Sequence, residues 1–168
     1  MMNEYSTQAS QSLTSNPADE AAICALFEQL VNSWNQGAGE AYGELYEEDA
    51  DYVAFNGSRK KGRAAIAKQH QQLFDTFLKG THLKGQIDSM RFLSSEVALV
   101  HTTGGTLMSW QSDASIPRRK SIQTLVARKS EGKWHFVAFH NTRIGSMDIE
   151  TIASGIANLL WQKLRPSR

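Results

Sequence analysis

The sequence predicts an α+β fold in which a strongly curved antiparallel sheet forms a cone, three helices pack on its concave side and a further helix follows at the C-terminus. Two observations lead to this prediction. The first half of the chain shows mainly helical periodicity, and residues 81–144 change to strand-like segments separated by short turns. Strands joined by short turns pair antiparallel. Helices that cover one side of a curved sheet leave room for a pocket inside it.

The first helix begins at Asn16-Pro17, because Asn is a favourable N-cap and Pro suits the first turn. Residues 1–15 are rich in Ser, Gln, Thr and Asn and predict a mobile tail. Gly37 and Gly39 are expected to end the helix. Apolar side chains at helical spacing form one wide stripe: Ile23, Leu26, Phe27, Leu30, Val31 and Trp34.

Two shorter helices and a strand should follow. A helix is expected at 40–48, with Tyr42, Leu45 and Tyr46 as its packing residues, and a strand at 52–55 that ends in the tight-turn signal of 56–57. A third helix begins after 62–63. Its inner face should carry Ile66, His70, Leu73, Phe74 and Phe77.

The remaining pattern predicts a meander and a last helix. Four strands are expected at 81–93, 96–110, 118–129 and 133–144, with tight turns at 94–95 and 131–132 and a longer loop at 111–117. Gly104-Gly105 lies inside the second of these strands, where it predicts a bulge or a sharp bend. The segment 148–164 shows helical spacing. One domain is therefore expected at 16–145, between the tail and a helical extension at 146–168.

Composition excludes several classes of protein. Lys and Arg total 18 and Asp and Glu total 17, which leaves no electrostatic footprint for nucleic acid. No apolar run approaches the roughly 20 residues that cross a bilayer. The N-terminus lacks the basic and apolar regions of a signal peptide, so a cytoplasmic location is expected. Cys24 is the single cysteine, which excludes an intramolecular disulfide framework and a cysteine-based zinc site.

Several motifs match one superfamily. They are Trp34-Asn35-Gln36-Gly37, Leu45-Tyr46-Glu47-Glu48-Asp49-Ala50-Asp51, Gly62-Arg63-Ala64-Ala65-Ile66, and Gly132-Lys133-Trp134 leading to Phe139-His140-Asn141. Over about residues 18–145 the chain resembles the nuclear transport factor 2-like superfamily, which has a cystatin-like fold and includes ketosteroid isomerases and SnoaL-like cyclases. The stretches 52–57 and 139–143 resemble more narrowly the SgcJ/EcaC-type group.

The resemblance to the isomerases implies that their chemistry is missing here. Their carboxylate base falls on Ala54, which cannot accept a proton, and their oxyanion-hole tyrosine falls on Leu30, which has no donor. A third position, a network tyrosine, falls on His70. The pocket therefore retains one titratable group without the base.

His70 is the candidate catalytic residue, because histidine can act as an acid or a base near neutral pH. The alternative is a hydrogen-bonded core histidine, since its helix face is apolar. No metal site is predicted. A site made of His70, His101 and His140 is conceivable by residue type, but strand alternation sets them on different faces, and none of the short-spaced pairs that zinc sites use supports it.

The candidate ligand-binding residues are Trp34, Tyr52, His70, Gln123, Asn141 and Arg143. In the kinase association domains of the superfamily, the basic pocket residues correspond to Thr102, Leu125 and Asn141 of this chain, which indicates that Asn141 and Arg143 face the pocket. Arg143 is expected at the pocket mouth, where it would pair with an anionic or carbonyl oxygen. Alternation places His140 on the opposite face together with Trp134, Phe136 and Ala138.

Two functions from different classes stay open. The first is a small-molecule pocket protein of the SnoaL-like type, which binds or transforms an apolar, oxygenated, polyketide-like ligand, as the resemblance implies. The second is a dimerisation or interaction module with an incidental pocket. No cofactor is expected, because the chain lacks a G-x-G-x-x-G motif. A homodimer through the outer sheet face is expected in either case, because the meander alternates apolar residues on both faces.

Overall fold

A six-stranded mixed sheet and three helices form the fold in the computed structural model, which describes residues 16–111, 117 and 119–145. The predicted tail, loop centre and C-terminal helix lie outside the described residues. The elements in chain order are α1 (Pro17–Asn35), α2 (Gly39–Gly43), β1 (Tyr46–Val53), β2 (Arg59–Lys61), α3 (Arg63–Asp75), β3 (His82–Ser94), β4 (Val97–Leu107), β5 (Arg119–Ser130) and β6 (Lys133–Arg143).

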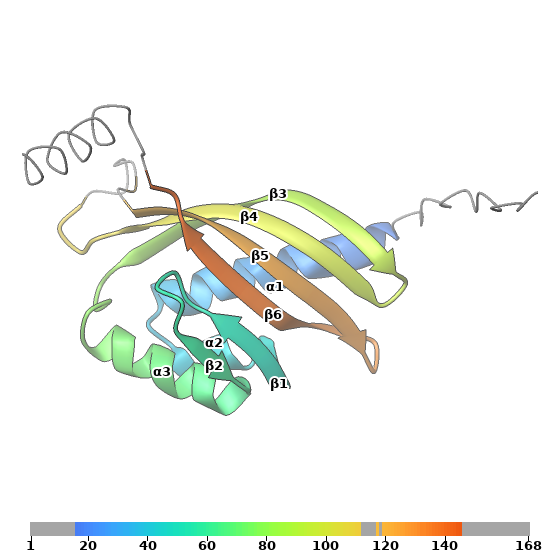
Figure 1. Ribbon diagram of the computed structural model, residues 1–168, viewed down its shortest axis with the longest axis horizontal. Helices are drawn as coiled ribbons and strands as arrows, with labels where there is room; N and C mark the ends of the chain where they lie inside the picture. Colours follow the sequence, from blue (N-terminus) through green and yellow to red (C-terminus); the bar gives the residue numbers. More distant parts are fainter. Residues whose placement is uncertain (1–15, 112–116, 118, 146–168) are drawn as a thin grey trace, which may run out of the picture.

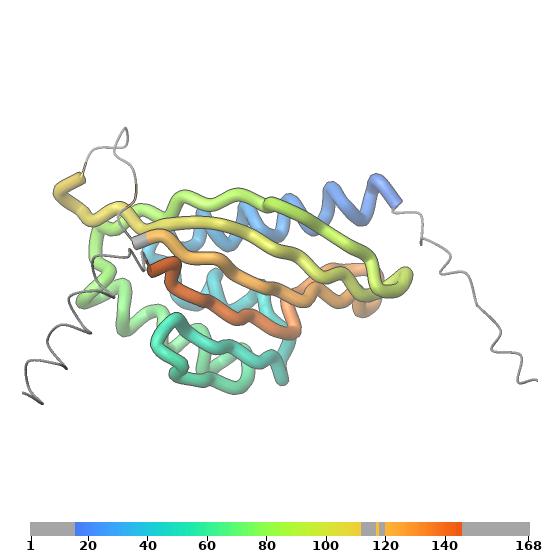
Figure 2. The backbone as a smooth tube through the Cα atoms, turned by 45° about the horizontal axis from the view of Figure 1, so that its top comes forward, coloured from blue at the N-terminus to red at the C-terminus, as the bar shows by residue number. Residues whose placement is uncertain are grey.

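The sheet curls over the helices and stays open at both edges. Its strand order is β2-β1-β6-β5-β4-β3, and all three helices lie on one side of it (Figures 1 and 2). The predicted α+β architecture is therefore confirmed. The sheet is not wholly antiparallel, however, because β1 pairs parallel to β6, with Tyr52 beside Phe139. The reason is topological, since α3 and the meander intervene between these two neighbours.

The segment predicted as a helix at 40–48 is helical only to Gly43, and β1 begins at Tyr46, so the prediction is wrong beyond Gly43. The backbone N–H of Phe136 donates to the carbonyl of Leu45 at 2.9 Å, and Tyr46 pairs with Phe136. Pairing with β6 overrides the local helical pattern there. The turn at Asn56-Gly57 is confirmed, but it joins β1 to the short strand β2, which was not predicted.

The third helix is shorter than predicted, because α3 ends at Asp75. Phe77 therefore does not lie on its inner face and is 84% exposed. The N–H of Leu78 donates to the carbonyl of Leu73 at 2.8 Å, and Gly80 adopts a positive φ of 68° before β3 begins. A positive φ is the usual signal that chain direction changes after a helix.

The four predicted meander strands are present, but the predicted bulge is not at Gly104-Gly105. The register of β4 is continuous there with both neighbours. A bulge lies in β6 instead, because Val126 pairs with Ala138 whereas Ala127 pairs with Phe136. Val137 is the extra residue between them. It turns Phe136 and Trp134 inward, so the predicted grouping of these two with His140 is wrong.

The core fills the space between α1, α2, α3 and the concave face. Its buried members include four large side chains with no exposed surface or almost none: Ile23, Tyr46, Phe136 and Leu125. Asp19 fixes the start of α1 to the sheet by accepting hydrogen bonds from Lys129 Nζ at 2.7 Å and Trp134 Nε1 at 2.9 Å. These hydrogen bonds hold the pKa of Asp19 below its ordinary value.

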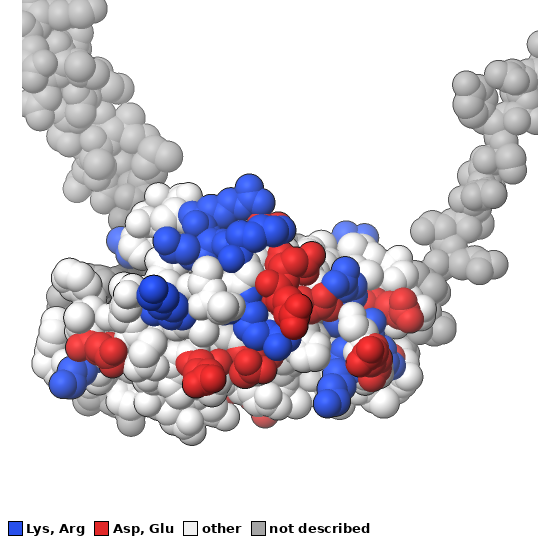
Figure 3. All heavy atoms as spheres, turned by 90° about the horizontal axis from the view of Figure 1, so that it is seen from below, with Lys and Arg blue, Asp and Glu red and all other residues white. Residues whose placement is uncertain are grey.

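Surface ion pairs lie on β1 and next to its start. Asp51 on β1 pairs with Arg59 at 2.6 Å and Lys61 at 3.5 Å, and Arg63 pairs with Glu44 at 3.5 Å. Basic and acidic side chains accordingly gather next to one another on the face seen in Figure 3. In the described part of the chain, no helix is long and apolar enough to cross a membrane.

Candidate ligand pocket

A cavity of about 370 Å³ lies between the helices and the concave face of the sheet. This volume is near the lower end of the roughly 300–1,000 Å³ typical of small-molecule sites. All six residues that the sequence indicated as ligand-binding line it: Trp34, Tyr52, His70, Gln123, Asn141 and Arg143. They come from α1, β1, α3, β5 and β6, so the fold brings together residues from five elements.

The inner end of the cavity is aromatic. Tyr42 stacks on His70 with ring centroids 4.1 Å apart, and Trp34 meets Phe74 edge to face at 5.4 Å. Trp34 also donates its indole N–H to Thr81 Oγ1 at 3.3 Å, which fixes the ring. This wall offers a rigid apolar surface to a ligand.

Tyr52 and Phe139 form the wall contributed by β1 and β6. Their rings are stacked with centroids 4.5 Å apart and planes 4° apart. The two residues are partners in the parallel pairing of their strands, so the stacking follows from the register. Burial raises the pKa of Tyr52 well above its ordinary value, and its hydroxyl therefore stays neutral.

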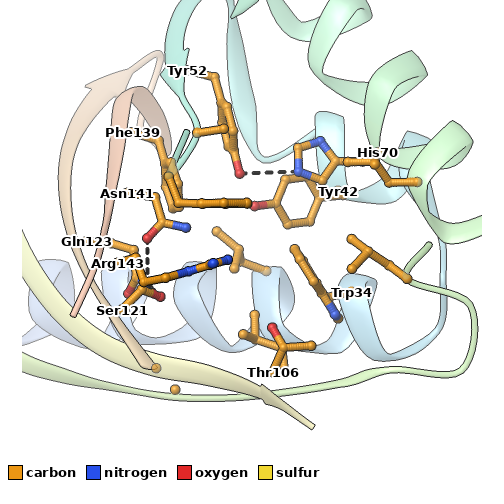
Figure 4. Close-up of a pocket in the computed structure, with 18 of the residues that line it drawn as sticks. Trp34, Tyr42, Tyr52, His70, Thr106, Ser121, Gln123, Phe139, Asn141 and Arg143 are labelled. Atoms are coloured by element: carbon orange, nitrogen blue, oxygen red, sulfur yellow. Dashed lines mark hydrogen bonds between the residues drawn. The ribbon is translucent and has the colours of Figure 1, made fainter. Parts of the chain in front are cut away.

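His70 is buried and holds a defined tautomer. Nδ1 lies 2.8 Å from the carbonyl oxygen of Ile66, which can only accept, so Nδ1 carries the proton. Nε2 then accepts from the Tyr52 hydroxyl at 3.3 Å (Figure 4). Burial lowers the pKa of His70 to about 4. A base this weak suits hydrogen bonding better than proton transfer at neutral pH, and the catalytic role of His70 stays a prediction.

The other end of the cavity is polar and built on β4, β5 and β6. Thr102 Oγ1 donates to Gln123 Oε1 at 2.7 Å, and Gln123 Nε2 donates to Ser121 Oγ at 2.6 Å and to Asn141 Oδ1 at 3.4 Å. Because Asn141 Oδ1 is an acceptor in this network, its amide nitrogen is the atom directed at the cavity (Figure 4). Arg143 lies beside it, with its guanidinium carbon 4.0 Å from the centre of the Phe55 ring.

The sequence interpretation missed several polar lining residues, namely Gln69, Asn56, Ser58, Thr106 and Lys120. Gln69 on α3 lines the cavity, and its Oε1 is buried without a hydrogen-bond partner among the described residues. A buried acceptor of this kind is costly unless a ligand or water donates to it. Its position in the sequence could have indicated this placement, because Gln69 adjoins His70 and lies four residues before Leu73. That spacing puts it at the edge of the inner face of α3.

The two positions that correspond to the catalytic groups of the isomerases lie in the cavity lining. Leu30 and Ala54 both line the cavity, so neither the proton acceptor nor the oxyanion donor of that chemistry is present at these positions. His101 and His140 belong to the other face of the sheet, where they flank Thr124 in register. In the described part of the chain, no group of three potential ligands could hold a metal ion.

Comparisons with known proteins agree with this architecture. A family model described as the calcium/calmodulin dependent protein kinase II association domain matches residues 19–145. No curated protein matches the chain. A solved domain of unknown function with a cystatin-like fold from Nostoc punctiforme PCC 73102 is 31% identical, covers 90% of this chain and 100% of its own, and superposes with a TM-score of 0.73.

Two further solved structures share the fold. An uncharacterised protein with a cystatin-like fold from Caulobacter vibrioides is 26% identical, with 84% of this chain and 96% of that chain covered and a TM-score of 0.67. An NTF-2 like protein of unknown function from Shewanella oneidensis MR-1 is 19% identical, with 74% and 98% covered and a TM-score of 0.62. At the three positions expected to be basic in the association domains, this chain has Thr102, Leu125 and Asn141.

Proposed function

The chain belongs to the calcium/calmodulin dependent protein kinase II association domain family, and we propose that within it this protein binds a small, apolar, oxygenated molecule in the cavity. The observation that carries the proposal is the cavity itself, in which aromatic walls meet convergent polar groups. A module that served only association would fill such positions with apolar side chains at lower cost, because each buried polar group without a partner costs about 1–3 kcal/mol.

The polar groups are the candidate ligand contacts. Gln69 Oε1 has no donor among the described residues and would accept from a ligand hydroxyl. Asn141 directs its amide nitrogen at the cavity (Figure 4) and would donate to a ligand oxygen. Trp34 and Tyr52 supply the apolar walls, and His70 fixes the Tyr52 hydroxyl. The polyketide-like character of the ligand and a cytoplasmic location are predictions from the sequence.

A thermal-shift screen of aromatic and alicyclic oxygenated compounds tests the proposal. A compound at a hundredfold excess over its Kd should stabilise the fold by about 2.7 kcal/mol. Both Asn141→Leu and His70→Phe should bind the compound with lower affinity. The free energy of unfolding at neutral pH should change little in Asn141→Leu. His140→Phe, which alters the other sheet face, is the matched control and should bind normally.

Severe destabilisation by both pocket substitutions, with no compound bound by the native chain, would show that these polar groups serve the core alone. A co-structure with any compound found would identify the contacts directly. Binding outside the cavity would contradict the proposal.

Association is the second candidate function, and the outer sheet face favours it. Leu99, Val126 and Ala138 form one apolar row across β4, β5 and β6, and Ile122 nearby is 42% exposed. We expect a homodimer through this face, because partly exposed apolar side chains arranged in a row favour burial against a partner. Sedimentation should give a dimer for the native chain and a monomer for Val126→Asp, whereas a native monomer at micromolar concentration would refute it.

A further inference from the structure

We infer that the ligand of this cavity carries an anionic group, held at the polar end by Arg143 and Asn141, with an apolar ring system against the aromatic end. This inference rests on the proposed binding function. It adds the charge and the orientation of the ligand.

The charge of the cavity lining is the first argument. Among the described residues that line the cavity there is no Asp or Glu, whereas Arg143 and Lys120 are both present. Arg143 points into the cavity (Figure 4), and Lys120, which adjoins Ser121 on β5, is the second cation of the lining. Neither residue forms an ion pair with a side chain of the described ranges 16–111 and 119–145. The guanidinium is thus available to a ligand carboxylate.

The hydrogen-bond network is the second argument. Thr102 donates to Gln123 Oε1, and Gln123 in turn donates to both Ser121 and Asn141. This directional chain uses acceptor atoms of Ser121 and Asn141 and leaves the Asn141 N–H groups and the Ser121 O–H to donate. The polar end therefore presents donors, which match the acceptor oxygens of an anion.

Space beside the guanidinium is the third argument. The sheet row that contains Arg143 continues through Ser121, Gly104 and Gly85. A Cβ on Gly85 would meet the Phe27 ring at 3.1 Å. The Phe27 ring therefore packs over Gly85, and the cavity reaches the row itself, because Gly85, Gly104, Ser121 and Arg143 all line it.

Phe55 fixes the position of the cation. It lies in the turn between β1 and β2, is 50% exposed, and its ring lies 4.0 Å from the Arg143 guanidinium carbon. A cation over an aromatic face keeps its N–H edges free for a bidentate partner. The arrangement thus pre-orients Arg143 without neutralising it.

Paired probes of equal shape test the inference: 2-naphthoate carries the anion, and 2-naphthamide is its neutral counterpart. Isothermal titration at low salt should give at least about tenfold tighter binding of the acid, which corresponds to 1.4 kcal/mol. The preference should shrink as salt is added, because Arg143 is partly exposed to screening ions. In Arg143→Gln the preference should fall below about twofold.

Arg91→Gln is the matched control, because it removes the same charge from an exposed position on β3 outside the cavity lining. It should retain the preference for the acid. Equal binding of both probes by the native chain, or an unchanged preference in Arg143→Gln, would overturn the anionic ligand and leave the binding function standing. Failure of both probes and of every compound in the thermal-shift screen would overturn both.

Discussion

The burial of His70 makes the stability of the protein depend on pH between about 6.5 and 4. The pKa of this histidine falls from 6.5 in the unfolded chain to about 4 in the fold, because burial penalises the charged ring more than the hydrogen bond to Ile66 favours it. The unfolded chain therefore binds a proton at a higher pH than the folded chain does. Stability from this group is fully present above pH 6.5 and is lost as the pH falls towards 4.

The size of the loss follows from the two pKa values. At about pH 5 the histidine is almost wholly protonated in the unfolded chain and mostly neutral in the fold, which lowers the free energy of unfolding by about 2 kcal/mol relative to neutral pH. Near pH 4 the loss approaches about 3 kcal/mol. A change of this size is a large fraction of the 5–15 kcal/mol typical of a domain.

Urea unfolding at about pH 7.5, 6 and 5 measures this loss in the native chain and in His70→Phe. The variant should be less stable at neutral pH, by about 1–2 kcal/mol, because the Tyr52 hydroxyl loses its acceptor. Its stability should then fall less steeply with acid. His140→Gln removes an exposed histidine and should keep the native slope. Identical slopes in the native chain and in His70→Phe would refute the reasoning.

Three more predictions concern packing and chemistry. Gly62 has a φ of 87°, and a Cβ there would lie 2.8 Å from a β1 backbone oxygen, whereas Gly132 has a φ of 79° and a Cβ there would have no atom within 4 Å. Urea unfolding should therefore show a larger loss of stability for Gly62→Ala than for Gly132→Ala. Equal losses of roughly 1–2 kcal/mol, as the positive φ alone would give, would exclude the clash. Gln123→Leu should lower the free energy of unfolding by about 1–3 kcal/mol, because Thr102, which is 0% exposed, loses the acceptor of its hydroxyl. Adding Thr102→Val should recover part of this loss, and a double variant no more stable than Gln123→Leu would contradict the prediction. Ala54 supplies no proton acceptor, so a spectrophotometric assay should detect no double-bond isomerisation of a 3-ketosteroid, and turnover comparable to a true isomerase would refute the correspondence.

Much of the fold was predictable because its signals are local. The stripe of α1, its Asn16 cap and the alternation of the meander strands each depend on residues a few positions apart. The hairpin turn at Glu131-Gly132 is equally local, since both residues adopt positive φ, at 52° and 79°, as a two-residue type I′ turn requires. The errors arose where pairing between strands far apart in the sequence decided the conformation. Tyr46, for example, is in a strand because it pairs with Phe136 of β6.

The six predicted ligand-binding residues all line the cavity, but Gln69 and the interactions among the lining residues were not predicted. The resemblance to the association domains and strand parity together selected Asn141 and Arg143, which both follow the bulge and keep the parity of Phe139. Parity failed for Trp134, because a bulge at Val137 adds one residue and reverses the faces before it. No local pattern marks such an insertion, which depends on how β5 and β6 fit together.

The sequence by itself determined α1, the start of α3 and the four meander strands, and that one apolar interior would contain a few polar groups, because periodicity and side-chain chemistry are properties of neighbouring residues. Only the tertiary structure decided that β1 lies parallel to β6, that Gln69 has no donor and that Arg143 rests on Phe55. Each of these depends on residues brought together from distant parts of the chain. Their hydrogen bonds, burial and charge environment exist only once the sheet has curled around the cavity.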